Sequence, residues 1–239
     1  HPYQTNISLD NCFTEALLDA KRSAMSKAGL ERLSTNQLEI CAETAESANC
    51  DLHQETLNYF DGGYIRETQV ILREEPKAGV FRECEITIKA DVRTYEQRTN
   101  PLITASASIT GNKVKIDGQE VQIVGEVSAN STVQLLGWYP KSSGDVYYKI
   151  VPNQFEELTN VTGKFQIPSK EAATKYALIA EFDENLEDQF ASEVLIVLVT
   201  NKNFPLIDSE RSEDLFRRLD AFGRENWKMI KVSYTIARD

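Results

Sequence analysis

Four cysteines carry the most definite chemistry in the 239-residue chain: Cys12, Cys41, Cys50 and Cys84. Their spacing includes no close C-x2-C pair of the kind that holds zinc, and only two histidines accompany them. An even number of cysteines in one region is typical of disulfides in an exported protein; the alternative is four reduced, buried thiols in a cytosolic protein. We predict the pairs Cys41–Cys50, which would close a polar loop, and Cys12–Cys84, which would tie a helix to a strand.

The sequence shows no recognisable catalytic constellation. His53 is the only internal histidine, and its polar surroundings favour a surface residue over the base of a hydrolase triad. There is no G-x-S-x-G nucleophile motif and no phosphate-binding glycine loop. Among 37 acidic residues, no spacing singles out a pair for glycoside hydrolysis. We therefore predict a protein that is not an enzyme, with no catalytic residue and no cofactor; a hydrolase with an unrecognised site is an alternative.

One acidic segment partly matches a calcium-binding loop. Residues 183–188 place side-chain oxygens at the first, third and fifth positions of such a loop. The sixth position requires glycine and the twelfth a bidentate glutamate, but this chain has Asp188 and Val194 there. We interpret the segment as a solvated hairpin tip and predict no metal site.

A cluster of aromatic residues forms the candidate binding surface: Trp138, Tyr139, Tyr147 and Tyr148. They fall on two successive expected strands. Aromatic rings on strands serve either in packing, which we favour, or as a platform that binds a ligand.

The first part of the chain has the pattern of an α+β unit. Apolar residues recur every three or four positions from Asp10 or Asn11 to about Leu33, which predicts a helix. Alternation over 64–73 and 80–92 predicts a β-hairpin. We expect a disulfide-bonded domain over residues 1–97, followed by a linker at residues 98–101.

The second part, residues 98–239, has the pattern of an Ig-like β-sandwich with a C-terminal helix and strand. Short strand patterns alternate with turn signals from residue 114 to 182, and 194–199 reads as a strand buried on both faces. Helical spacing follows over 209–222, ended by Gly223, and 229–236 alternates as a last strand.

Charge and hydropathy exclude two classes of partner. The net charge of −11 opposes binding to nucleic-acid phosphates and to anionic lipid surfaces. The longest apolar run, 194–199, is far shorter than the ~20 residues that cross a bilayer. We expect a protein that does not span a membrane and lies in the periplasm or outside the cell. Because the chain begins at His1 without a signal-peptide pattern, we expect the signal peptide to have been removed.

Two regions resemble known bacterial families. Residues 121–200 resemble the family catalogued as domain of unknown function 4384. The resemblance lies in an apolar–aromatic strand, a Gly-Asp turn, a Pro-Asn pair and a Gly-Lys-x-x-x-x-Pro segment: 133–139, 144–145, 152–153 and 163–168. It implies an Ig-like accessory module without catalytic residues.

The first 95 residues resemble the N-terminal unit of the flagellar assembly protein T family and related envelope lipoproteins. The shared pattern is a helix opening with Glu15-Ala16, followed by alanines at 20, 24 and 28 and then a hairpin. This resemblance implies a periplasmic protein of an envelope assembly. Our leading hypothesis is therefore a non-enzymatic structural or interaction protein that binds other envelope proteins, within a secretion or flagellar-type machinery. A glycan- or peptide-binding module is the alternative from a different class.

Overall fold

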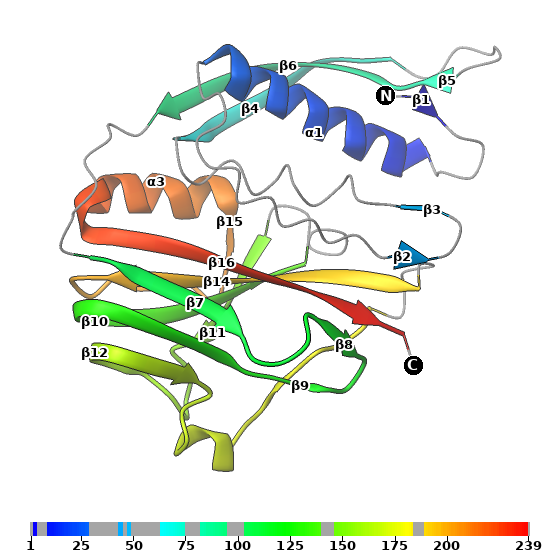
Figure 1. Cartoon of the computed structure of the whole chain (residues 1–239). Helices are drawn as coiled ribbons and strands as arrows, with labels where there is room; N and C mark the ends of the chain where they lie inside the picture. The colour runs from blue at the N-terminus through cyan, green and yellow to red at the C-terminus, as the bar shows by residue number, and fades with distance from the viewer. Residues whose placement is uncertain are drawn as a thin grey trace. The chain divides into compact units, whose positions relative to one another are not determined.

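The computed structural model describes residues 2–3, 9–28, 43–44, 47–48, 63–74, 82–94, 103–139, 146–183 and 189–238. These residues form a strand-rich α+β structure with few helices, which confirms the coarse fold prediction and is compatible with a β-sandwich (Figure 1). The chain divides into two compact units, residues 1–37 with 54–96 and residues 38–53 with 97–239. The sequence-based domain ranges, 1–97 and 98–239, remain predictions.

The first unit contains a helix and a long β-hairpin. Helix α1 (Leu9–Lys27) packs on strand β6 (Glu85–Thr94), which pairs antiparallel with β4 (Gly63–Glu74). Two short strands, β1 (Pro2–Tyr3) and β5 (Arg82–Glu83), also pair antiparallel in this unit. The helix begins at Leu9, one or two residues before the start that the sequence indicated, Asp10 or Asn11. Its expected last residues, 29–33, lie outside the described part.

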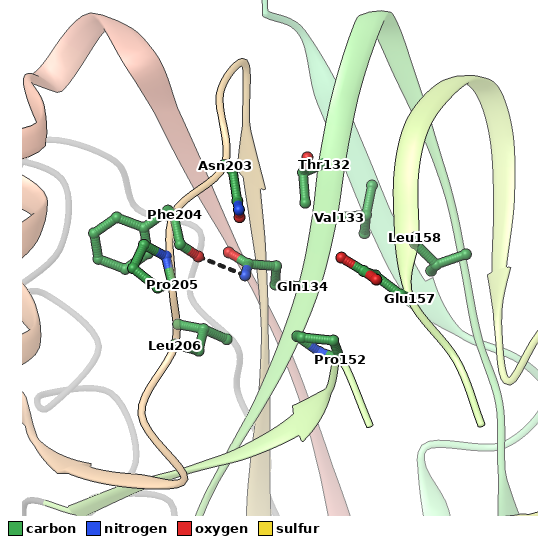
Figure 2. A pocket seen from close by; sticks show the side chains of 10 residues that line it. All are labelled: Thr132, Val133, Gln134, Pro152, Glu157, Leu158, Asn203, Phe204, Pro205 and Leu206. Carbon is green, nitrogen blue, oxygen red and sulfur yellow. Dashed lines mark hydrogen bonds between the residues drawn. The ribbon is translucent and has the colours of Figure 1, made fainter. Parts of the chain in front are cut away.

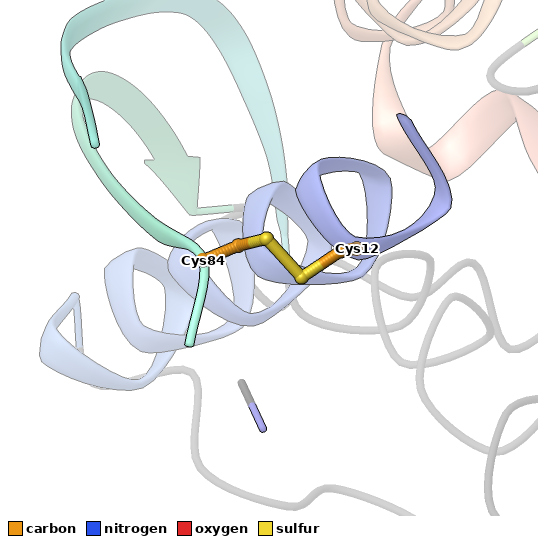
Figure 3. Close-up of a disulfide and its surroundings, with 2 residues drawn as sticks. All are labelled: Cys12 and Cys84. Carbon is orange, nitrogen blue, oxygen red and sulfur yellow. A yellow bond between two sulfur atoms is a disulfide. The ribbon is translucent and has the colours of Figure 1, made fainter. Parts of the chain in front are cut away.

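A disulfide fastens the helix to the hairpin in this unit. Cys12 of α1 and Cys84 are joined, with their Cα atoms 6.0 Å apart (Figure 3), and both side chains are buried. Phe13 and Ala16 pack around the bridge, and the Arg73 guanidinium lies 3.9 Å from the centre of the Phe13 ring. The structure therefore contains one of the two predicted disulfides. Cys41 and Cys50 lie outside the described residues, so their pairing remains a prediction.

The second unit is built around one long central strand. Near its start, β10 (Ile123–Trp138) pairs with β7 (Ala105–Ile109) on one edge and β12 (Leu158–Ile167) on the other. Towards its end it pairs with β14 (Phe190–Thr200) and β11 (Val146–Val151). Register shifts after Val127 and Ser131 separate the two halves. The sequence pattern predicted two separate strands here, 121–127 and 132–139, because nothing in it indicates that one strand continues while its pairing partners change.

The remaining strands either extend this sheet or form separate two-stranded sheets. β16 (Trp227–Ala237) pairs with β14 along its whole length, and β8 (Val114–Ile116) adds in parallel to the end of β16. The short elements are β9 (Glu120–Val121) paired with β13 (Leu178–Ile179), β15 (Ser209–Arg211) on β11, β2 (Glu43–Thr44) paired with β3 (Ser47–Ala48), and two 3-10 turns (Ala172–Thr174 and Arg224–Asn226).

Side chains of β10 alternate between two buried layers. Val133 and Leu135 enter a core shared by β7, β12, β14 and β16. The intervening Leu136 and Trp138 face the other way, because successive residues of a strand point to opposite faces. Within this unit, helix α3 (Ser212–Phe222) packs at that second face: Trp227 Nε1 of β16 donates to the Leu219 carbonyl oxygen at 3.1 Å. The predicted C-terminal helix and strand are thus present, although residues 209–211 form β15 rather than the start of the helix.

Candidate functional site

A pocket of about 210 Å³ opens beside β10 in the second unit (Figure 2). Residues 132–134 of β10 form its floor. One wall is the segment 203–206, and the other consists of Pro152 and residues 157–158. All of these residues belong to one unit, so the pocket is a property of that fold alone.

The floor of the pocket carries an unsatisfied hydrogen-bond acceptor. Gln134 is 2% exposed, and its Nε2 donates to the carbonyl oxygen of Phe204 at 2.8 Å. That bond fixes the orientation of the amide, because a carbonyl can only accept. The other amide atom, Oε1, is buried and has no hydrogen-bond partner among the described residues. Buried acceptors of this kind are rare and mark places where a donor is missing.

The wall formed by residues 203–206 is fixed by contacts with helix α3. Arg218 of α3 donates a hydrogen bond to the Pro205 carbonyl oxygen, and its guanidinium lies 4.8 Å from the centre of the Phe204 ring. Glu210 accepts a second bond from Arg218 at 2.6 Å. The Phe204 ring also makes an edge contact with Phe222, with centroids 5.2 Å apart. The wall is therefore fixed by the fold before any ligand binds.

The opposite wall is fixed by the Pro-Asn motif. The peptide bond before Pro152 is cis, and Asn153 Oδ1 then accepts from the backbone N–H groups of Phe155 and Glu156 at 2.8 and 2.9 Å. The buried Glu156 carboxylate accepts from the Ser169 N–H at 2.7 Å and from the Tyr176 hydroxyl. Ser169 follows the second cis proline, Pro168. The two sequence motifs thus meet in space and anchor the chain that leads to Glu157.

The electrostatics of the pocket favour a positive ligand. Glu157 is the single charged residue among those that line it, and it makes no ion pair within the described part of the chain. In Figure 2 its carboxylate and the Asn203 amide both point towards the Gln134 side chain. The pocket is therefore lined by an anionic acceptor, the Glu157 carboxylate, and a neutral one, Gln134 Oε1, between walls that carry both polar and apolar side chains.

A second polar group lies at one end of the apolar core. Glu193 of β14 pairs in register with Tyr234 of β16, and Tyr139 directly follows β10, whose last residue, Trp138, pairs with Val194. The Tyr234 hydroxyl donates to Glu193 Oε2, and Tyr139 also hydrogen-bonds this carboxyl group. Glu193 is 3% exposed.

The surroundings of Glu193 change its acidity. Burial raises the pKa of the Glu193 carboxyl from 4.5 to about 7, and the negative charge of Glu181 adds to this shift. The hydrogen bonds from Tyr234 and Tyr139 act in the opposite direction but do not cancel the effect of burial. Burial and the nearby Glu193 raise the pKa of both tyrosines. The Glu193 carboxyl group can therefore take up or release a proton near neutral pH.

The four aromatic residues of the candidate binding surface divide between the two layers. Trp138 and Tyr147 are buried with ring centroids 6.1 Å apart, and Tyr147 contacts Phe216 of α3 edge-on. Tyr139 is half-buried beside Tyr148, which is 39% exposed. Trp138 and Tyr147 therefore pack within the fold, while Tyr148 alone of the four is exposed.

The structure describes only part of the other sites considered from the sequence. His53 and residues 184–188 of the calcium-like segment lie outside the described residues. Among the described residues, no three His, Cys, Asp or Glu side chains are grouped so that they could hold a metal ion. No described helix is long and apolar enough to cross a membrane.

Neither Gln134 nor Glu193 was identified from the sequence. Gln134 is a single polar residue between apolar ones, Val133 and Leu135, and Glu193 comes directly before the apolar run 194–199. A polar residue that interrupts a buried strand is the signal that could have identified them. The sequence gives no means of finding their partners, since Phe204 lies 70 positions from Gln134.

No protein-family model, curated protein or solved structure matches the chain.

Proposed function

We propose that this protein is a non-enzymatic interaction module of the periplasm, or of another extracytoplasmic compartment, that binds other envelope proteins in a secretion or flagellar-type assembly. The resemblances noted from the sequence support this role, and they also support an Ig-like assignment for the second unit. The Cys12–Cys84 disulfide is consistent with an oxidising compartment.

An exposed apolar stretch of β4 carries the proposal. Val70, Ile71 and Leu72 are consecutive and are 47%, 62% and 41% exposed. The register with β6 passes from Val70↔Ile88 to Leu72↔Thr87, so Ile71 faces no residue of the neighbouring strand. Such a bulge turns adjacent side chains outwards. Contiguous exposed apolar residues on a soluble domain are typical of a surface that a partner covers.

Site-specific crosslinking tests the role. A photoreactive benzoyl-phenylalanine replacing Ile71 should give a discrete adduct with one envelope protein in cells that make this protein naturally. Excess purified wild-type protein should compete with the adduct, and purified protein carrying Val70→Thr, Ile71→Ser and Leu72→Thr should compete much less. The same group replacing Lys89, an exposed residue of β6 in the same hairpin, is the matched control. A monomer without adducts at Ile71, or equal adducts at both positions, would contradict the proposal.

A further inference from the structure

We propose that the pocket beside β10 binds the guanidinium group of an arginine side chain presented by a partner polypeptide. This inference rests on the proposed function, because it gives the chemistry of one contact with the partner. The residues that carry it are Gln134, Glu157 and the two walls between which they lie.

The free acceptor on the floor requires a hydrogen-bond donor. Because Gln134 Nε2 is committed to Phe204, Oε1 is left to accept a hydrogen bond from an N–H or O–H group, and Gln134 lines the pocket from which such a group can approach. Leaving a buried acceptor unpaired is unfavourable, so a ligand that supplies this donor gains from a group that is already desolvated and oriented.

The negative charge of Glu157 favours a positively charged hydrogen-bond donor over a neutral one. Its carboxylate has no cationic partner in the part of the chain that the structure describes, and no positive residue lines the pocket. A hydroxyl-bearing ligand would satisfy Gln134 but leave this charge unused. The net charge of −11 further favours the approach of a positive group.

The arrangement of acceptors favours arginine over lysine. A guanidinium presents five N–H donors in a plane and can bond a carboxylate and a carbonyl at the same time, whereas an ammonium is a compact point charge. The apolar surfaces of Pro152, Pro205 and Leu206 are suited to the methylene part of the side chain. The fixed walls mean that little structure must be ordered when the side chain enters.

Titration with small model compounds tests the inference on the whole protein. N-acetyl-arginine amide and the tripeptide Gly-Arg-Gly should cause saturable NMR shifts at the Gln134 side-chain amide and in residues 203–206. The N-acetyl amide of citrulline, which has nearly the same shape without the charge, should bind much more weakly, and the lysine analogue should fall between them. Free arginine distinguishes a peptide side chain from a small metabolite, because its own charged termini should weaken binding.

A matched pair of variants locates the contact. Glu157→Gln should weaken N-acetyl-arginine amide binding about fivefold, as expected for one exposed charge pair. Glu120→Gln makes the same change of net charge at an exposed site on β9, outside the pocket, and should leave the affinity unchanged. Higher ionic strength should weaken binding to the wild type more than to Glu157→Gln.

Several results would overturn the inference. They are a lack of saturable binding, equal binding of the arginine and citrulline compounds, or tighter binding of free arginine than of the tripeptide. Failure here is distinguishable from failure of the proposed function. Crosslinks at Ile71 with no arginine binding would remove only the pocket assignment, whereas arginine binding without crosslinks would remove the envelope role and leave the pocket.

Discussion

The hydroxyl of Tyr234 on β16 donates a hydrogen bond to the Glu193 carboxylate on the neighbouring strand β14, where the two residues are directly paired in the register. This places an ionisable group at the end of an otherwise apolar core. Its protonation is therefore coupled to the stability of the second unit.

We expect the stability of the protein to fall as the pH rises from about 4.5 to about 7. Burial raises the pKa of Glu193 to about 7 in the folded state, so the folded protein binds a proton that the unfolded chain releases near pH 4.5. This contribution is complete below pH 4.5, decreases through the window and is lost above pH 7. A shift of this size corresponds to about 3 kcal/mol.

Urea denaturation of the wild type and Glu193→Gln at several pH values measures this effect. The variant should lack the decrease between pH 4.5 and 7 and should be the more stable of the two at pH 8. Glu181→Gln should lower the Glu193 pKa, because it removes a neighbouring negative charge, so the decrease should end at a lower pH than in the wild type. Parallel curves for wild type and Glu193→Gln would contradict the assignment.

Removing the disulfide should destabilise the first unit. The double variant Cys12→Ser/Cys84→Ser opens a link that spans 72 positions, and chain entropy alone gives roughly 4 kcal/mol for a loop of that length. Thermal melts under non-reducing conditions check this, with reduced wild type as the comparison. Non-reducing peptide mapping should recover Cys12 joined to Cys84; recovery of Cys12 with Cys41 would contradict the structure.

Two glycines of β10 should respond differently to alanine. A Cβ on Gly125 would lie 2.4 Å from the Ser106 carbonyl oxygen of β7 and 2.3 Å from the Phe165 ring, and the strand backbone cannot easily retreat. We expect Gly125→Ala to lower the free energy of unfolding by about 1–3 kcal/mol. At Gly137 the nearest atom is the flexible end of Ile150 at 3.0 Å, so Gly137→Ala is the milder control. Equal effects in denaturant titrations would argue against the close approach of β7 and β10.

The Tyr176 hydroxyl should stabilise the wall that leads to Glu157. Tyr176→Phe keeps the ring that stacks on Phe155 but removes the donor to the buried Glu156 carboxylate. Losing one donor to a buried, charged acceptor should cost about 1–3 kcal/mol. Tyr148→Phe, at a more exposed tyrosine, is the control and should change the melting temperature little. A similar small shift for both variants would show that the hydrogen bond contributes little.

The sequence determined the local elements and their chemistry. The periodicity around Phe13 and the alternation near Cys84 predicted a helix and a hairpin, and the preferred cysteine pairing, Cys12–Cys84, which joins them, is present. The apolar run at 194–199 predicted a strand buried on both faces, and the structure confirms it. These features follow from residue order, because backbone periodicity decides which side chains share a face.

Only the tertiary structure decided which distant residues meet. Gln134 and Phe204, Glu193 and Tyr234, and Glu156 and Ser169 come together because β10 changes partners along its length and because the two proline motifs converge. Nothing in the local sequence encodes those pairings, since they depend on strand order and register across the whole sheet. The pocket and the buried carboxyl group arise from that long-range arrangement, because only packing removes a polar atom from water and leaves it to be satisfied by a particular neighbour.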